Sequence, residues 1–198
     1  MYDYRKMTPA QRAEIVKQRR ARLRPWHSPP HGTTNGDGYL ITATCFEHKS
    51  VIGKNPARMT VCEEEVLSRV HKFCTEVHAW CVLPNHYHLL ATTIRLKELV
   101  KELGRFHGRS SFAWNDEDTC RGRKVWHRCF DRAIRSERHF WATVNYIHHN
   151  PIYHGYVEKW QHWPWSSAAA FLQNVGRAEA ERIWAEYPIL DYGSKWDI

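Results

Sequence analysis

Short apolar blocks along the middle of the chain predict strands. Residues Tyr39 to Phe46 are β-branched and aromatic, which favours a strand. Two further short runs, Ala79 to Leu83 and Tyr87 to Thr93, flank the turn residues Pro84-Asn85 and predict an antiparallel hairpin. Trp126 to Arg135 predicts a last strand.

Longer blocks with helical spacing lie between and after these strands. Thr60, followed by three glutamates, predicts a helix from about Val61 to Val77. Apolar residues at core spacing predict a second helix from Leu96 to about Ser111. A third helix is expected from Glu137 to Asn150 and should end before Pro151. The order β-α-β-β-α-β predicts an α+β, ferredoxin-like sandwich with a four-stranded antiparallel sheet, followed by one more helix.

The 198 residues suit one compact domain with an extension at each end. Residues 1–38 are expected to form a basic helical arm, from Thr8 to Arg24, and a linker. This arm is either solvated or in contact with phosphates. Residues 39–172 would form the functional domain, and residues 173–198 a C-terminal extension.

Composition points to a polyanionic partner inside the cell. Lysine and arginine number 29 against 21 acidic residues, a net charge of +8. The six cysteines form no CxxC pair, which indicates a reduced, intracellular protein. The N-terminus lacks the apolar run of a signal peptide, and no stretch approaches the roughly 18 apolar residues of a membrane span. We therefore expect a cytoplasmic protein without a membrane partner.

Two histidines in the predicted hairpin, His86 and His88, suggest a metal site. Side chains two apart on a strand point to the same face, so the two imidazoles project together. One buried histidine alone is usually a core residue, but two on one face just after a turn favour metal binding. A divalent ion needs further ligands from elsewhere in the chain.

The predicted helix before Pro151 offers such a ligand on its polar side. At about 100° per residue, a phenol and a carboxamide four residues apart fall on this side. The residues on this polar side are His139, Thr143, Tyr146 and Asn150. A tyrosine here can simply be exposed, but beside a histidine pair the tyrosine and the amide form a coherent site.

The segments LPNHYHLL, VNYIHHNP and WPWSS together resemble those of the single-strand DNA transposases of the HUH superfamily. The resemblance is greatest to the REP-associated tyrosine transposases, where REP stands for repetitive extragenic palindrome. It covers roughly Tyr39 to Leu172, and its most specific feature is the histidine pair followed about sixty residues later by Tyr-x-x-x-Asn-Pro.

The resemblance implies a role for each of these residues. His86 and His88 would bind the metal, Tyr146 would be the nucleophile, and Asn150 the third ligand. The implied cofactor is Mg²⁺, with Mn²⁺ expected to substitute. The implied activity is cleavage and rejoining of single-stranded DNA at REP-like hairpins through a 5′-phosphotyrosine intermediate. His149 lies nearer to the Tyr146 side of the helix than His148 and is a candidate helper in proton transfer.

Several basic and aromatic residues could hold DNA. A charge run is usually a solvated face, and phosphate contact is the second interpretation. The candidates are Lys97, Lys101, Arg105 and Arg109 on the second helix and Arg132 and Arg135 on the last strand. A tryptophan cluster should mainly pack against the domain, with base stacking as the alternative. Its members are Trp160, Trp163 and Trp165.

Two other functions remain open on sequence alone. The spacings of His71 and Cys74, of His78 and Cys81 and of His127 and Cys129 suggest a zinc-stabilised nucleic-acid-binding module. The second open function is that of a hairpin-binding protein that derives from a transposase but no longer cleaves DNA. The sequence specifies neither the palindrome nor whether the protein is a monomer or a homodimer.

Overall fold

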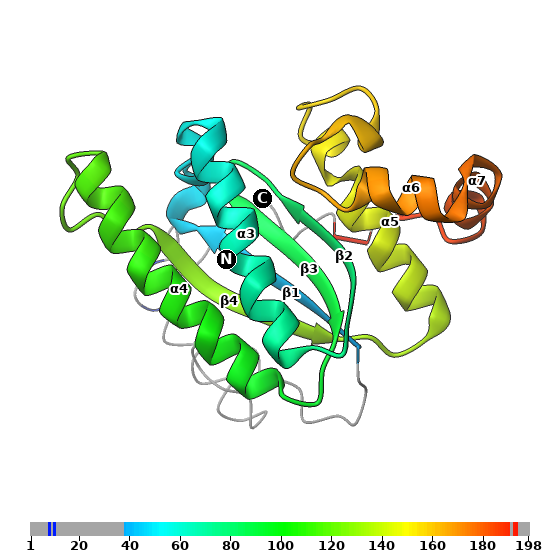
Figure 1. Ribbon diagram of the computed structural model, residues 1–198, viewed down its shortest axis with the longest axis horizontal. Helices are drawn as coiled ribbons and strands as arrows, with labels where there is room; N and C mark the ends of the chain where they lie inside the picture. Colours follow the sequence, from blue (N-terminus) through cyan, green and yellow to red (C-terminus); the bar gives the residue numbers. More distant parts are fainter. Residues whose placement is uncertain (1–7, 9, 11–37, 191, 194–198) are drawn as a thin grey trace.

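A computed structural model describes Thr8, Ala10, residues 38–190 and residues 192–193 (Figure 1). The rest of the expected N-terminal arm and linker lies outside the described residues. The expected boundary between residues 172 and 173 falls inside a helix, so residues 173–175 continue an element of the preceding segment.

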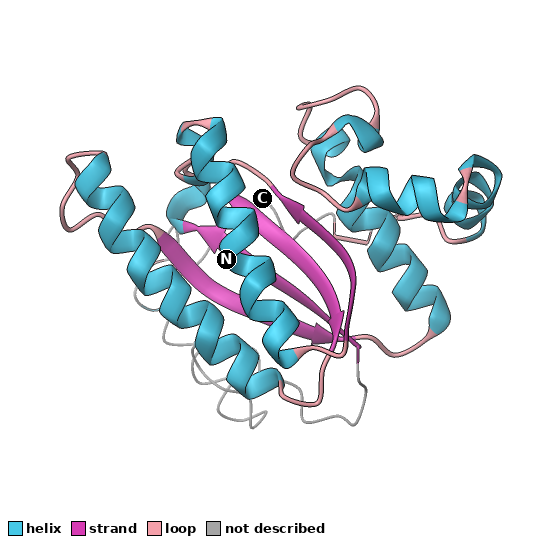
Figure 2. Cartoon of the chain, viewed as in Figure 1, coloured by secondary structure: helices cyan, strands magenta, loops and turns pink. Residues whose placement is uncertain are grey.

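Four antiparallel strands form one sheet in the order β2-β3-β1-β4 (Figure 2). The strands are β1 (Gly38–Cys45), β2 (Glu76–Val82), β3 (His86–Thr92) and β4 (Trp126–Ala133). Each agrees with a predicted strand to within about three residues at either end. The sequence of elements and the strand order confirm the predicted ferredoxin-like α+β sandwich.

Helices cover both faces of this sheet. Helices α3 (Pro56–Phe73) and α4 (Leu96–Glu117) lie side by side over one face (Figure 1). Helix α5 (Glu137–Tyr153) contacts β2 and β3. The 3-10 turn η3 (Trp160–His162) and the short helices α6 (Ala168–Val175) and α7 (Arg177–Glu186) follow α5. Two further 3-10 turns, η1 (Phe46–His48) and η2 (Ile52–Lys54), lie between β1 and α3.

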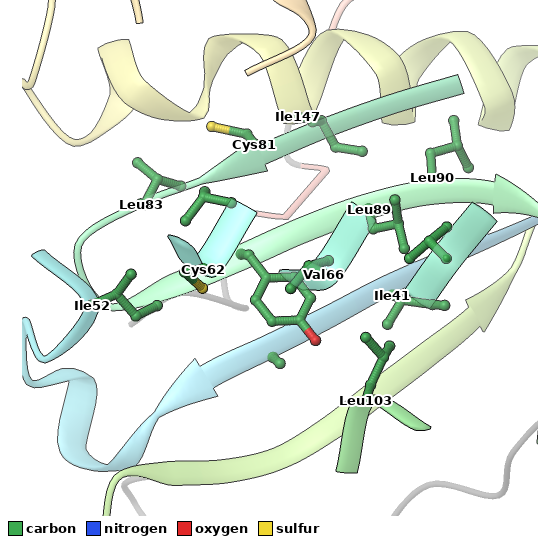
Figure 3. Packing of buried hydrophobic residues seen from close by; sticks show 14 of the residues in the cluster. Ile41, Ile52, Cys62, Val66, Cys81, Leu83, Leu89, Leu90, Leu103 and Ile147 are labelled. Carbon is green, nitrogen blue, oxygen red and sulfur yellow. The ribbon is translucent and has the colours of Figure 1, made fainter. Parts of the chain in front are cut away.

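Strand β3 is an inner strand of the sheet, and helices cover both of its faces. Tyr87 faces α4, where its hydroxyl lies 3.0 Å from His107 Nε2. The flanking His86 and His88 face α5, as alternation along a strand requires. All but the last residue of β3 are buried, which explains a nearly continuous apolar strand interrupted by histidines. Figure 3 shows part of the core, including Leu103 of α4 and Ile147 of α5.

The boundaries of α3 and α4 differ from the prediction. Helix α3 begins at Pro56, because the Asn55 side chain accepts a hydrogen bond from the Arg58 backbone N–H at 2.8 Å and so caps the helix. The proposed cap at Thr60 was wrong. Helix α3 also ends four residues before Val77, since Glu76 already pairs with β3. Helix α4 continues six residues beyond Ser111, where Trp114 packs in the core.

Helix α5 does not end before Pro151, contrary to the prediction. A proline removes one backbone donor and disfavours a helical conformation in the preceding residue. Here only two helical residues follow it, and the last carbonyls find partners beyond the helix. The backbone N–H of His154 donates to the Asn150 carbonyl at 3.1 Å, and that of Tyr156 to the Pro151 carbonyl at 2.9 Å. Asn150 therefore remains on the helix, one turn after Tyr146.

A buried ion pair joins the start of α3 to the end of α4. Arg58, 5% exposed, donates to both carboxylate oxygens of Asp118 at 2.8 and 3.0 Å. Arg123 donates to the same carboxylate at 2.8 Å. Hydrogen bonding from Arg58, followed by that from Arg123, lowers the pKa of Asp118 well below its ordinary value.

Asp118→Asn is expected to lower the free energy of unfolding by about 3 kcal/mol at pH 7, because it removes the buried partner charge of Arg58 and leaves that cation only the exposed Glu117 carboxylate. A depressed carboxyl pKa stabilises the fold above the ordinary pKa of about 4, and this contribution disappears as the pH falls through the folded-state pKa. Urea unfolding should therefore show a smaller loss of stability between pH 4 and pH 2 in the variant than in the wild type.

Glu117→Gln is the matched control, since the Glu117 side chain is 57% exposed although it also pairs with Arg58. Its cost should stay below about 1 kcal/mol. Equal costs for the two substitutions would contradict a special role for Asp118.

Candidate active site

The histidine pair lies directly after the turn between β2 and β3. His86 and His88 are both buried, with exposures of 0% and 1%, and their ring centroids lie 4.8 Å apart. The two rings share the α5 side of the sheet because the residues are two apart on the strand. The predicted convergence of the two imidazoles is therefore present in the fold.

Helix α5 places a phenol and an amide against these imidazoles. The Tyr146 hydroxyl lies 3.2 Å from His88 Nε2, and Asn150 Oδ1 lies 3.1 Å from His86 Nε2. Both contacts are buried and join residues that are far apart in the sequence. The spacing of one helical turn on α5 thus matches the spacing of two residues on β3, and all four predicted residues come together.

The neighbours of each imidazole fix which ring nitrogen carries the proton. His86 Nδ1 lies 2.7 Å from Asn85 Oδ1, which can only accept, so Nδ1 donates, and in the neutral imidazole Nε2 then keeps a lone pair. His88 Nδ1 lies 2.8 Å from Thr42 Oγ1. If the Tyr146 hydroxyl donates to His88 Nε2, the His88 Nδ1–H donates to Thr42. Both Nε2 lone pairs then face α5.

Sequence reasoning missed the two residues that orient the imidazoles. Thr42 becomes a partner of His88 only through the pairing of β1 with β3, where the two residues are directly opposite. Asn85 was noted as a turn residue, and its side chain additionally binds the next residue of the chain. A partner that orients the second nitrogen is typical of histidines that ligate metals.

The donor set fits a divalent cation. With the neutral His86 ring protonated at Nδ1, its Nε2 and the Asn150 Oδ1 are two acceptors 3.1 Å apart, and the buried Asn150 Nδ2 has no hydrogen-bond partner among the described residues. A bound cation between the two acceptors, or an amide turned by 180°, would relieve this arrangement. Two imidazole nitrogens and one amide oxygen suit a divalent metal, with imidazole favouring transition metals over Mg²⁺.

The alternative zinc site does not assemble. Within the residues that the structure describes, no three His, Cys, Asp or Glu side chains gather as a possible metal site. Cys81 is fully buried, and burial raises its thiol pKa, which disfavours the thiolate that zinc requires. The group of α5 that lies against His86 is an amide, that of Asn150.

The C-terminal segment lies against the candidate nucleophile. Tyr192 places its hydroxyl 2.6 Å from Thr143 Oγ1 and 3.0 Å from His139 Nε2. Gly193, with a φ of +82°, approaches the Tyr146 ring so closely that an added Cβ would lie 2.2 Å from it. Tyr146 is only 6% exposed as a result, and a DNA phosphate could not reach its hydroxyl in this arrangement. No pattern along the chain predicted this contact.

His148 and His149 have other partners than the nucleophile. His148 Nε2 lies 2.9 Å from Ser167 Oγ, and burial lowers its pKa to about 3. His149 Nδ1 donates to the Asn145 carbonyl at 3.1 Å, and burial lowers its pKa to about 4. Proton transfer by His149 thus remains a prediction that these hydrogen bonds do not support.

The basic candidates divide between two sides of the sheet. All six are exposed: Lys97, Lys101, Arg105, Arg109, Arg132 and Arg135. The first four lie on α4, across the sheet from Tyr146. Arg132 lies on the Tyr146 side, because it is opposite Leu40, which in turn is opposite Leu90 of β3. The structure thus does not bring the α4 cations to the candidate active site.

The tryptophan cluster mainly packs, as predicted. Trp163 is buried and donates its indole N–H to the Val82 carbonyl at 2.8 Å. Trp165 donates to Thr60 Oγ1 at 3.0 Å. Trp160 instead lies beside α5, where its ring is nearly parallel to those of His148 and His149.

Two curated relatives share part of the sequence. The REP-associated tyrosine transposase of Escherichia coli K12 is 29% identical over 119 residues, which are 56% of this chain and 62% of that protein. A putative REP-associated tyrosine transposase of Haemophilus influenzae is 32% identical over 133 residues, which are 62% of this chain and 73% of that protein. The chain therefore spans less than two thirds of the length of the E. coli relative.

A solved structure shares the fold. It is that of a REP-associated tyrosine transposase bound to a REP hairpin, with a TM-score of 0.53 and 21% identity. The match covers 76% of this chain and 86% of that one. No protein-family model matches the chain. Among the described residues, no helix is long and apolar enough to cross a bilayer.

The sequence similarity defines the class of protein as that of the tyrosine transposases, and the shared fold agrees with it. The H. influenzae relative is matched at 32% identity over nearly three quarters of its length. The chain belongs to the family of REP-associated tyrosine transposases.

Proposed function

We propose that the protein is a metal-dependent single-stranded DNA endonuclease and transposase that cleaves and rejoins DNA beside hairpins through Tyr146. The observation that carries this proposal is the 3.2 Å contact between the Tyr146 hydroxyl and His88 Nε2. It lies in the same buried cluster as His86 and Asn150. A phenol beside convergent metal donors is an arrangement that suits covalent phosphodiester chemistry.

Tyr146 would act as the nucleophile in a transesterification. Its oxygen forms a bond to phosphorus as its proton leaves, and the bond from phosphorus to the 3′ oxygen breaks. The products are a 5′-phosphotyrosine and a strand with a free 3′-OH, which takes up a proton. The phosphodiester energy is retained in the covalent link, so the reverse attack by a 3′-OH rejoins DNA without ATP.

The neighbouring residues would prepare the nucleophile and hold the cation. A free tyrosine has a pKa near about 10, so loss of the phenolic proton is part of the barrier. His88 Nε2 lies 3.2 Å from this phenol and can accept its hydrogen bond when His88 Nδ1 carries the ring proton. His86, His88 and Asn150 would hold Mg²⁺ or Mn²⁺, which supplies a Lewis acid for a non-bridging phosphate oxygen. Thr42 and Asn85 keep the imidazoles in the required orientation.

The proposed partner is a single strand with a hairpin. The net charge of +8 favours a polyanion, and the similar solved structure is that of a protein bound to a REP hairpin. The exposed cations on α4 offer phosphate contacts that position DNA without reading bases. Because α4 lies across the sheet from Tyr146, these cations would hold DNA remote from the cleaved bond.

A hairpin binder without cleavage is the second candidate function. The observation in its favour is the burial of Tyr146 beneath Gly193. The two functions differ in one product, since only the first yields a covalent protein–DNA adduct.

Replacing Lys97, Lys101 and Arg109 together with Ala is expected to weaken hairpin binding and reduce its salt dependence. Each lost phosphate contact should lower the slope of log affinity against log salt by about 1, so three contacts lower it by about 3. Fluorescence anisotropy between 50 and 300 mM salt measures the slope.

Arg182→Ala serves as the charge control, because Arg182 is exposed on α7 and pairs with Glu179. Its slope should match that of the wild type. An unchanged slope in the triple variant would exclude α4 from the DNA interface.

A further inference from the structure

A cavity of about 230 Å³ opens on another side of α5, outside the Tyr146 cluster. Helix α5, the η3 turn, α6 and α7 all contribute to its wall. Its lining includes Asn145, His149, Trp160, Arg177, Glu181 and Trp184. Neither the sequence motifs nor the proposed cleavage chemistry accounts for this cavity.

Its walls are flat and aromatic. The ring of Trp184 is stacked on that of His149, with centroids 3.6 Å apart and planes 25° apart. The ring of Trp160 lies 5.6 Å from His149 with planes 29° apart. Trp184 is 38% exposed, so part of its indole is available to a ligand. Nearly parallel rings around a small cavity suit a planar aromatic guest.

The cavity also carries polar groups of both kinds. Arg177 and Glu181 form a loose pair, with 3.8 Å between Nη1 and Oε1, and both side chains are about 70% exposed. Such an exposed pair is weak and can exchange partners. His149 donates through Nδ1 to the Asn145 carbonyl, so its Nε2 can accept, and this nitrogen has no hydrogen-bond partner among the described residues. The cavity thus offers a cation together with acceptors.

We propose that this cavity binds one unpaired nucleobase of the DNA strand that flanks the hairpin. The base stacks on the aromatic wall at Trp184, its edge donates to the acceptors of the cavity, and Arg177 contacts the adjoining phosphate. Single-stranded nucleic acids are held in this way, by stacking on aromatic side chains beside basic groups. The inference rests on the proposed function in that it requires DNA as the partner.

The position of the cavity connects it to cleavage. Asn145 and His149 line it, and they directly precede Tyr146 and Asn150 on α5. A base held at this place would fix the DNA strand relative to the nucleophile, because the lining residue His149 and Tyr146 belong to the same helix. Trp184 and Arg177 would then be specificity-determining residues rather than catalytic ones.

Equilibrium binding in EDTA tests this proposal without any cleavage. Hairpin oligonucleotides with single-stranded flanks carry one abasic site at each flanking position in turn. For the wild type, one position should weaken binding about tenfold, the effect expected of one stacked base. That position should have no effect with Trp184→Ala, whereas Trp184→Phe should restore it. Phe112→Ala, which removes an aromatic ring 80% exposed on α4, should retain the full discrimination.

Each outcome decides between the proposals. Absence of a sensitive position in the wild type, or persistence of the abasic effect in Trp184→Ala, overturns the base-binding cavity while leaving cleavage by Tyr146 intact. Failure of the wild type to bind any hairpin oligonucleotide overturns DNA as the partner, and the cavity proposal with it. Thermal unfolding of each variant confirms that the protein is folded.

Discussion

Tyr146→Phe is expected to lower DNA cleavage by at least about a thousandfold, because it removes the proposed nucleophile, the oxygen that would form the covalent link to phosphorus. The substitution deletes one oxygen and leaves the ring that packs against His88 and Gly193. Binding of the hairpin should stay within about twofold of the wild type, since the hydroxyl is buried. Single-turnover cleavage of a labelled oligonucleotide, beside a binding titration, separates the two effects.

Tyr156→Phe is the matched control, because Tyr156 lies shortly after α5 and is partly exposed. It should cleave at the wild-type rate. Cleavage that survives in Tyr146→Phe would assign the nucleophile to another residue, and equal losses in both variants would indicate a general effect of removing a phenol.

His86→Ala is expected to weaken Mn²⁺ binding by at least about a hundredfold, because it removes one of two imidazole donors from a three-donor set. Thr42→Val should weaken it by about tenfold, since Thr42 only orients His88. Calorimetric titration of the DNA-free protein measures both affinities, so the result does not depend on cleavage.

His71→Ala provides the comparison for His86→Ala, since His71 is an exposed histidine on α3. Its Mn²⁺ affinity should be unchanged. If His86→Ala bound Mn²⁺ as tightly as the wild type, the two histidines would be buried residues that hydrogen-bond to their neighbours and not a metal site.

The sequence predicted the sheet and the four central site residues because their signals are local. The alternation on β3 places His86 and His88 on one face, and helical periodicity places Tyr146 and Asn150 on one side of α5. Only the contact between these two elements needed the fold, and the resemblance to transposases supplied that expectation. The structure then gave the distances that join the two pairs.

The missed features depend on tertiary contacts that no local pattern contains. Thr42 is an ordinary strand residue until the register of β1 and β3 places it opposite His88. The start of α3 was placed too late because Thr60 resembles a cap, whereas Asn55 before Pro56 is the actual one. Continuation of α5 past Pro151 depends on backbone donors supplied by the following loop.

The sequence also did not predict on which side of the sheet the basic residues of α4 lie relative to Tyr146. The regular spacing on α4 predicted an exposed stripe, and Lys97, Lys101 and Arg109 are exposed. Periodicity could not indicate which face of the sheet α4 covers. That face follows from Tyr87, which meets α4 on the side opposite to His88.

The most direct measurement of the central claim is a covalent-adduct assay with a single-stranded hairpin oligonucleotide labelled at either its 5′ or its 3′ end. With Mn²⁺ or Mg²⁺, the wild type should form an adduct that survives denaturation and carries only the 3′-labelled fragment, since Tyr146 becomes joined to a 5′ phosphate. EDTA and Tyr146→Phe should each abolish it. An adduct that carries the 5′-labelled fragment, or tight hairpin binding with no adduct under either metal, would contradict the proposed nuclease.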